Sequence, residues 1–238
     1  MKTLISTIIT LLVLNVSHAQ FWNNGKKIRG NGNVTTITRT TPDYDGISCA
    51  GPFDYILVAG TEGKITIEGE ENLLEHIVTE VKGNKLVVKT ENHINLRPSS
   101  NKTITVTIPF KDIDNISLAG SGDLSNKDMV TANDLDVSLA GSGDMVLTVE
   151  TTHVKGSLAG SGDLTLKGNT NDLEAHIAGS GDFHGFDLQA NNTDVSIAGS
   201  GDAEVVSKQS LKARIAGSGD IVYKGNPGKE DSKVAGSG

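Results

Sequence analysis

The pentapeptide Ala-Gly-Ser-Gly-Asp occurs six times in the second half of this chain, and a further Ala-Gly-Ser-Gly stands at its C-terminus. The copies follow one another at intervals of 18 to 21 residues and start at Ala119, Ala140, Ala159, Ala178, Ala198, Ala216 and Ala235. A fixed period near 20 residues is typical of a chain that builds one small unit and stacks copies of it. Stacked chains present long, regular faces, which suit binding better than a single deep catalytic pocket.

Apolar residues flank each pentapeptide, as Leu158 and Leu164 flank the copy that starts at Ala159. A second alternating run, such as Leu135 to Leu139, fills the rest of each repeat. Alternation with period two predicts β-strands with one buried face. The sequence therefore predicts an all-β fold, a solenoid-like stack of rungs of about 19 residues. A β-meander or an open barrel is compatible with the same alternation.

The two glycines of each pentapeptide permit a sharp corner with little side-chain bulk. If the rungs stack, these corners lie above one another, and their glycines are structural turn residues. They are Gly120, Gly122, Gly141, Gly143, Gly160, Gly162, Gly179, Gly181, Gly199, Gly201, Gly217 and Gly219.

Stacked corners would also align the aspartates about 4.8 Å apart, the spacing of neighbouring strands. At that distance two carboxylates repel by roughly 1 kcal/mol in water and by about 3 to 4 kcal/mol at an effective dielectric of 20. Either each carboxylate accepts backbone N–H hydrogen bonds, or a cation such as calcium lies between successive carboxylates. The first is favoured because calcium prefers six to eight oxygens, and no other cofactor is expected. The calcium candidates are Asp123, Asp144, Asp163, Asp182, Asp202 and Asp220.

Residues 46–110 are predicted to form irregular N-terminal rungs, and residues 111–238 the regular repeats, all within one domain. Val34 to Thr40 alternates and predicts a strand before this domain. The run from Ile104 to Ile108 has the clearest alternation, and Pro109 is expected to end that strand. A cluster of Glu68, Glu70 and Glu71 is expected to be solvated.

The first 19 residues have the pattern of a secretory signal peptide. Lys2 precedes a mostly apolar run, and Ser17-His18-Ala19 predicts cleavage between Ala19 and Gln20. Residues 20–45 then form a polar leader. The apolar run is short for a membrane span, so no transmembrane segment is expected after cleavage. The protein is predicted to be exported to the periplasm, the outer-membrane surface or the extracellular space.

The remaining residues give no sign of a catalytic or metal site or of a nucleic-acid interface. The net charge of -8 argues against a nucleic-acid partner. Cys49 is the only cysteine, which excludes an intrachain disulfide and favours a small buried side chain. The histidines beyond the signal peptide show no metal-ligand spacing and are interpreted as surface or strand residues. They are His76, His93, His153, His176 and His184.

The N-terminal half adds a resemblance to a known family. It rests on Gly51-Pro52-Phe53-Asp54, Gly69 to Leu74, Glu80-Val81 and Leu86 to Val88, followed by the Gly-Ser-Gly-Asp series. Together they resemble the putative auto-transporter adhesin family, known by its head GIN domain, over residues 46–238. The resemblance implies a right-handed β-helix-like fold, a place in the envelope of a Bacteroidetes-type bacterium, and no established catalytic residues.

These observations predict a non-enzymatic envelope or surface protein with an adhesive or scaffolding role. Its expected partners are a surface glycan or an envelope protein, and self-association through the C-terminal rung is a further expectation. The alternatives are a polysaccharide-active β-helix enzyme and a calcium-stabilised structural protein resembling a β-roll. Identical corners argue against the enzyme, since a catalytic carboxylate pair needs two different environments.

Overall fold

The protein is a β-solenoid of about six turns with a spacing of about 19 residues. The structure, a computed structural model, describes residues 25–238; the predicted signal peptide and its cleavage point at Ala19 and Gln20 lie outside them. Strands of successive rungs pair in parallel, with Leu139 beside Leu158 and Leu158 beside Ile177. A β-meander or an open barrel built from hairpins would pair consecutive strands antiparallel, so the parallel ladder excludes both and leaves the solenoid.

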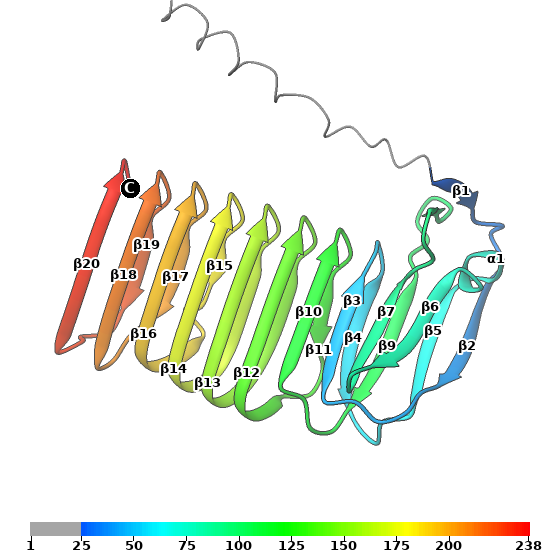
Figure 1. The fold of residues 1–238 in the computed structure, drawn as a ribbon, viewed down its shortest axis with the longest axis horizontal. Coiled ribbons are helices and arrows are strands. Elements are labelled where there is room, and N and C mark those ends of the chain that lie inside the picture. The colour runs from blue at the N-terminus through cyan, green and yellow to red at the C-terminus, as the bar shows by residue number, and fades with distance from the viewer. Residues whose placement is uncertain (1–24) are drawn as a thin grey trace, which may run out of the picture.

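Each rung consists of two strand segments joined by one tight corner and one wider bend, and the rungs lie side by side along the long axis (Figure 1). We call the Ala-Gly-Ser-Gly-Asp pentapeptide of each rung its tight corner. The strands of the regular repeats are β10 (Asn115–Gly120), β11 (Leu124–Asn126), β12 (Val130–Gly141), β13 (Met145–Gly160), β14 (Leu164–Gly179), β15 (Phe183–His184), β16 (Leu188–Gly199), β17 (Ala203–Val206), β18 (Ser210–Gly217), β19 (Ile221–Lys224) and β20 (Lys229–Gly236).

An antiparallel layer closes the N-terminal end of the stack. Its strands and the first rungs are β1 (Lys26–Arg29), β2 (Val34–Thr40), β3 (Gly46–Ala50), β4 (Asp54–Ala59), β5 (Lys64–Glu70), β6 (Ile77–Lys82), β7 (Lys85–Thr90), β8 (Ile94–Arg97) and β9 (Thr105–Phe110), with the short helix α1 (Glu71–Leu74). β2 pairs antiparallel with β5, and β5 with β9. Within the described part of the predicted leader, β2 thus belongs to the main sheet, and the predicted strand at Val34–Thr40 is confirmed. β1 forms a separate two-stranded sheet with β8.

The core is a set of columns, because the parallel register places equivalent residues of successive rungs on top of one another. One column contains Leu118, Leu139, Leu158, Ile177 and Ile197, each at most 2% exposed. Cys49 continues this column in the first rung and is 1% exposed, as expected for a small buried side chain. Burial raises the pKa of its thiol well above the usual range.

Pro109 lies inside β9, so the expectation that it ends the strand was wrong. Its carbonyl oxygen accepts a hydrogen bond from the hydroxyl of Tyr44 instead of a ladder N–H. The neighbouring strand on that side, β5, pairs with β9 only as far as Thr107. The proline nitrogen therefore faces no ladder acceptor, and a proline can continue a strand at such a position.

Glu70 is 1% exposed, so the expectation that it belongs to a solvated acidic cluster was wrong. Its carboxylate accepts hydrogen bonds from the N–H of Gly32 at 2.6 Å, the N–H of Ser99 at 2.7 Å and the hydroxyl of Ser99 at 2.6 Å. Three donors satisfy the buried charge. These bonds, that of the Ser99 hydroxyl above all, lower the pKa of Glu70.

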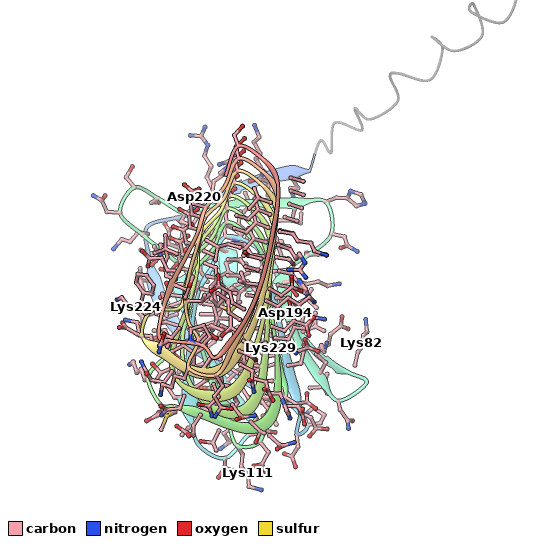
Figure 2. All side chains as sticks on the ribbon, turned by 90° about the vertical axis from the view of Figure 1, so that its left-hand side faces the viewer. Lys82, Lys111, Asp194, Asp220, Lys224 and Lys229 are labelled. Carbon is pink, nitrogen blue, oxygen red and sulfur yellow. The ribbon has the colours of Figure 1, made fainter. Side chains whose placement is uncertain are left out.

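Two broad faces and two edges result from this stacking. Seen along the long axis, Asp220 lies near the edge of the tight corners and Lys111 at the opposite edge (Figure 2). Asp194 and Lys229 lie on one broad face, which is formed by the strands that lead into the corners, whereas Lys224 lies on the other (Figure 2). No helix within residues 25–238 is long and apolar enough to cross a membrane.

Candidate functional site: an acidic corner column and a charged groove

The two glycines of each tight corner are required for different reasons. The first has a positive φ, +133° at Gly141 and +136° at Gly160, where other residues are strained. The second approaches the rung before it so closely that a Cβ on Gly143 would lie 1.9 Å from the carbonyl oxygen of Gly122. The predicted turn glycines therefore stand at positions that no larger residue fits.

The corner aspartates form a hydrogen-bonded ladder, which we call the acidic column. The backbone N–H of Asp144 donates to Oδ1 of Asp123 at 3.0 Å, and the same bond recurs at every step to Asp220, at 2.7 to 3.0 Å. A hydrogen bond to a charged acceptor contributes about 1.5 to 3 kcal/mol. This exceeds the repulsion of roughly 1 kcal/mol expected for carboxylates in contact with water.

The acidic column therefore needs no cation to offset its charge, which is the first of the two arrangements considered from the sequence. Oδ2 of each aspartate takes no part in the ladder. The calcium sites at Asp123, Asp144, Asp163, Asp182, Asp202 and Asp220 stay a prediction.

Sequence reasoning missed the first member of the column, Asp54. Tyr55 pairs in register with Leu124, so Asp54 lies beside Asp123. Burial and the charge of Asp123 raise the pKa of Asp54. The signal was present in Ala50-Gly51-Pro52-Phe53-Asp54, which keeps the alanine, the first glycine and the aspartate of the pentapeptide at the same spacing.

A groove of about 800 Å³ runs along the broad face of the strands that lead into the corners, and it is lined by residues of β7, β10, β12, β13, β14, β16, β18 and β20. Its floor comes from one inward-facing column and its rim from charged side chains on either side of that column. The floor residues are Leu135, Val154, Leu173, Thr193 and Leu211, and the rim includes Asp134, Asp136, His153, Lys155, Asp172, Glu174, Asp194 and Lys212.

Two ion pairs join neighbouring rungs along the rim, whereas Glu174 and Asp194 are like charges on consecutive rungs. Lys155 Nζ lies 3.2 Å from Glu174 Oε1, and Lys212 Nζ lies 2.6 Å from Asp194 Oδ2. Asp172 accepts a hydrogen bond from the Asn192 amide at 2.7 Å, which lowers the pKa of its carboxyl group. Alignment of the repeats on their register could have found this rim, since its members occupy two positions of each rung, one on either side of the floor column.

One contact on this face resembles a hydrolytic triad. His176 lies with Nδ1 2.6 Å from Oγ of Ser196 and with Nε2 2.5 Å from Oε1 of Glu174. The His176 hydrogen bond, followed by that of Lys155, lowers the pKa of Glu174. Ser196 is paired with a strand on each side, with His176 in β14 and Arg214 in β18. The backbone N–H groups here belong to the ladder, so they are not free to stabilise an oxyanion.

The comparison with known families agrees with this geometry. The model of the family described as putative auto-transporter adhesin, head GIN domain, matches residues 43–227. The chain belongs to this family. The resemblance expected from the sequence is thereby confirmed. No curated protein matches the chain.

Several solved structures from Parabacteroides and Bacteroides species resemble this head GIN domain. A protein of Parabacteroides distasonis named a putative lipid binding protein is 29% identical, with a TM-score of 0.74, over 90% of this chain and 98% of that one. A putative adhesin of Bacteroides fragilis is 24% identical, with a TM-score of 0.80, over 88% and 96% of the two chains. A putative adhesin of Parabacteroides merdae is 24% identical, with a TM-score of 0.68, over 89% and 97%. At these lower identities the likeness concerns the fold.

Proposed function

We propose that this head GIN domain is an exported, non-enzymatic adhesin-like protein that binds a polar polymer, either a surface glycan or an envelope protein, in the charged groove. The observation that carries the proposal is the continuity of the groove along the stack from β10 to β20. A ligand that repeats along its length can place one charged or hydroxyl group at each rung. The membership in an adhesin family supports a surface role.

The burial of the groove floor favours a polar ligand over an acyl chain. Leu135, Val154 and Leu173 are each 2% exposed, and Leu211 is 3% exposed. A ligand in the groove therefore touches the charged rim more than the apolar floor. The Parabacteroides distasonis relative is named a putative lipid binding protein, and the apolar atoms that are accessible in this groove lie outside the floor.

The binding proposal is tested with a glycan array and with capture of partners from an envelope extract. The groove variant carries Lys155→Glu and Lys212→Glu, which reverse two rim charges. The matched control carries Lys167→Glu and Lys224→Glu, which reverse two charges that each stand four residues after a corner aspartate. Lys224 lies on the face opposite the groove (Figure 2). Loss of binding in the groove variant alone is expected. Equal binding by both variants, or no ligand in either assay, would contradict the proposal.

Export is proposed on the signal-peptide pattern of residues 1–19. Digestion of intact cells by an added protease tests the compartment, because only a protein on the outer surface or outside the cell is accessible. The periplasm is the alternative destination, and protection until the outer membrane is permeabilised would identify it.

We further propose that β20 pairs with β20 of a second copy. All eight residues of β20 are exposed, and Val234 is 53% exposed although it continues the column of Ile197 and Ile215. Antiparallel pairing centred on Ser232 would place Asp231 of each copy opposite Lys233 of the other. This complementarity favours a second copy as the occupant of the free edge.

A further inference from the structure

The residue two positions after the corner aspartate differs from rung to rung on the face opposite the groove. In six rungs it has no imidazole, whereas in the rung of Asp182 it is His184. The parallel register places Thr165, His184 and Glu204 on consecutive rungs at this position. Only one step of the acidic column therefore has a nitrogen ligand beside it.

His184 and two aspartates of the column converge. Asp163, Asp182 and His184 each offer one ligand atom, and these atoms all lie within 4.8 Å of one another. The ladder occupies Oδ1 of both aspartates, because Asp163 accepts the N–H of Asp182 at 3.0 Å and Asp182 accepts the N–H of Asp202 at 2.7 Å. The other oxygen of each carboxylate remains for a ligand, and Oδ2 of Asp163 lies 4.0 Å from Nε2 of His184.

Glu204 stands on the far side of the imidazole. Its Oε2 lies 3.5 Å from Nδ1 of His184. A carboxylate near Nδ1 favours the tautomer with the proton on that nitrogen. The lone pair of Nε2, the nitrogen on the side of Asp163, is then available to bind a metal. Histidines that bind metals commonly have such a carboxylate on their second nitrogen.

We propose that Asp163, Asp182 and His184 bind a divalent transition-metal ion of the zinc type, with Glu204 orienting the imidazole. One imidazole and two carboxylates are suitable ligands for zinc, which takes four ligands in tetrahedral geometry. Three protein ligands leave a fourth position for water or for a donor from a bound partner. Calcium prefers six to eight oxygens and gains little from a nitrogen. Within residues 25–238 this is the one group of three or more such residues that could hold a metal.

Isothermal titration of the tag-free protein with zinc chloride tests the site. We expect saturable binding of one zinc ion per chain, loss of that binding in His184→Ala, and unchanged binding in the matched control His176→Ala. Both imidazoles are 43% exposed, so neither replacement opens the core. Circular dichroism verifies that both variants fold.

A second pair of variants separates metal binding from the ladder. Asp163→Asn keeps the acceptor for the N–H of Asp182 but loses the charge, and Asp144→Asn makes the same change one rung away from the site. Zinc affinity is expected to fall in the first variant and to persist in the second. Glu204→Gln is expected to weaken binding by about 10-fold or more.

Three outcomes would overturn the proposal: no zinc binding by the native chain, equal binding in His184→Ala, or equal loss in Asp144→Asn and Asp163→Asn. Titration with calcium chloride distinguishes the earlier calcium hypothesis. If calcium affinity is unchanged in His184→Ala but falls in both Asp144→Asn and Asp163→Asn, the cation binds along the whole acidic column instead.

Discussion

At the scale of single residues, the tight corner is fixed by distances to the rung before it. Gly143 lies so near the carbonyl oxygen of Gly122 that a single methyl group has no space. The atom in the way is backbone, and its displacement would separate two paired strands. The neighbouring Ser142 is exposed.

Gly143→Ala is therefore expected to destabilise the protein by about 3 kcal/mol or more, in the upper range of overpacking costs. Ser142→Ala, one residue away, is expected to change the free energy of unfolding by less than about 0.5 kcal/mol. Urea denaturation of both variants measures the difference. Similar urea midpoints for Gly143→Ala and Ser142→Ala would show that the backbone of the corner can shift to accommodate a Cβ.

The acidic column leads to a second prediction at this scale. Asp144→Ala removes the acceptor for the N–H of Asp163 and is expected to cost about 1 kcal/mol, as at exposed capping sites. Asp144→Asn keeps the acceptor and removes the repulsion from both neighbours, so its stability is expected to equal or exceed that of the native protein. Thermal melting at low and high salt checks both. A greater loss in Asp144→Asn than in Asp144→Ala would contradict the ladder.

At the scale of elements, the N-terminal layer is joined by one buried carboxylate. Glu70 at the end of β5 binds the backbone between β1 and β2 and the segment after β8. The two flanking segments thereby share one charged acceptor, and protonation of Glu70 weakens both contacts together.

This contact predicts a dependence of stability on pH. The pKa of Glu70 in the folded protein is lowered from the ordinary value of 4.5, mainly by the Ser99 hydroxyl. Its contribution is therefore fully present above pH 4.5 and is lost as the pH falls through the folded pKa. Glu70→Gln is expected to lower the melting temperature at pH 7 and to flatten its decline below pH 4.5. If the melting temperatures of the native protein and Glu70→Gln fall equally with pH below 4.5, Glu70 is not the group that causes the decline.

At the scale of the whole molecule, the two ends of the stack differ. The antiparallel layer covers one end, whereas β20 at the other end has a free edge. Analytical ultracentrifugation is expected to show concentration-dependent dimers. Val234→Lys should abolish them, while Val146→Lys, at a residue 40% exposed on β13, should not. A native chain that stays monomeric at high concentration would refute the pairing.

The stacking of the repeats could be predicted from the sequence because the pentapeptide copies define the register of the rungs. Each Ala-Gly-Ser-Gly-Asp copy marks the same point of a rung, so stacking places residues such as Asp144 and Asp163 together without further information. The contacts of Glu70 could not be predicted, because its partners Gly32 and Ser99 lie far away in an irregular part of the chain. The contact of His184 was missed for a related reason: it meets Asp163 only across the step between two rungs, and the spacing of the histidines along the chain does not mark this contact.

The pairing of corner with corner in β13, β14 and β16 has a consequence for the length of the stack. Deletion of residues 141–159 would join Ala140 to Gly160 and recreate the same pentapeptide at the junction. Such a chain is expected to fold with one rung fewer, which circular dichroism can check. Recombination between misaligned copies can therefore shorten or extend this molecule in steps of about 4.8 Å, and its reach can be adjusted without redesign of either end.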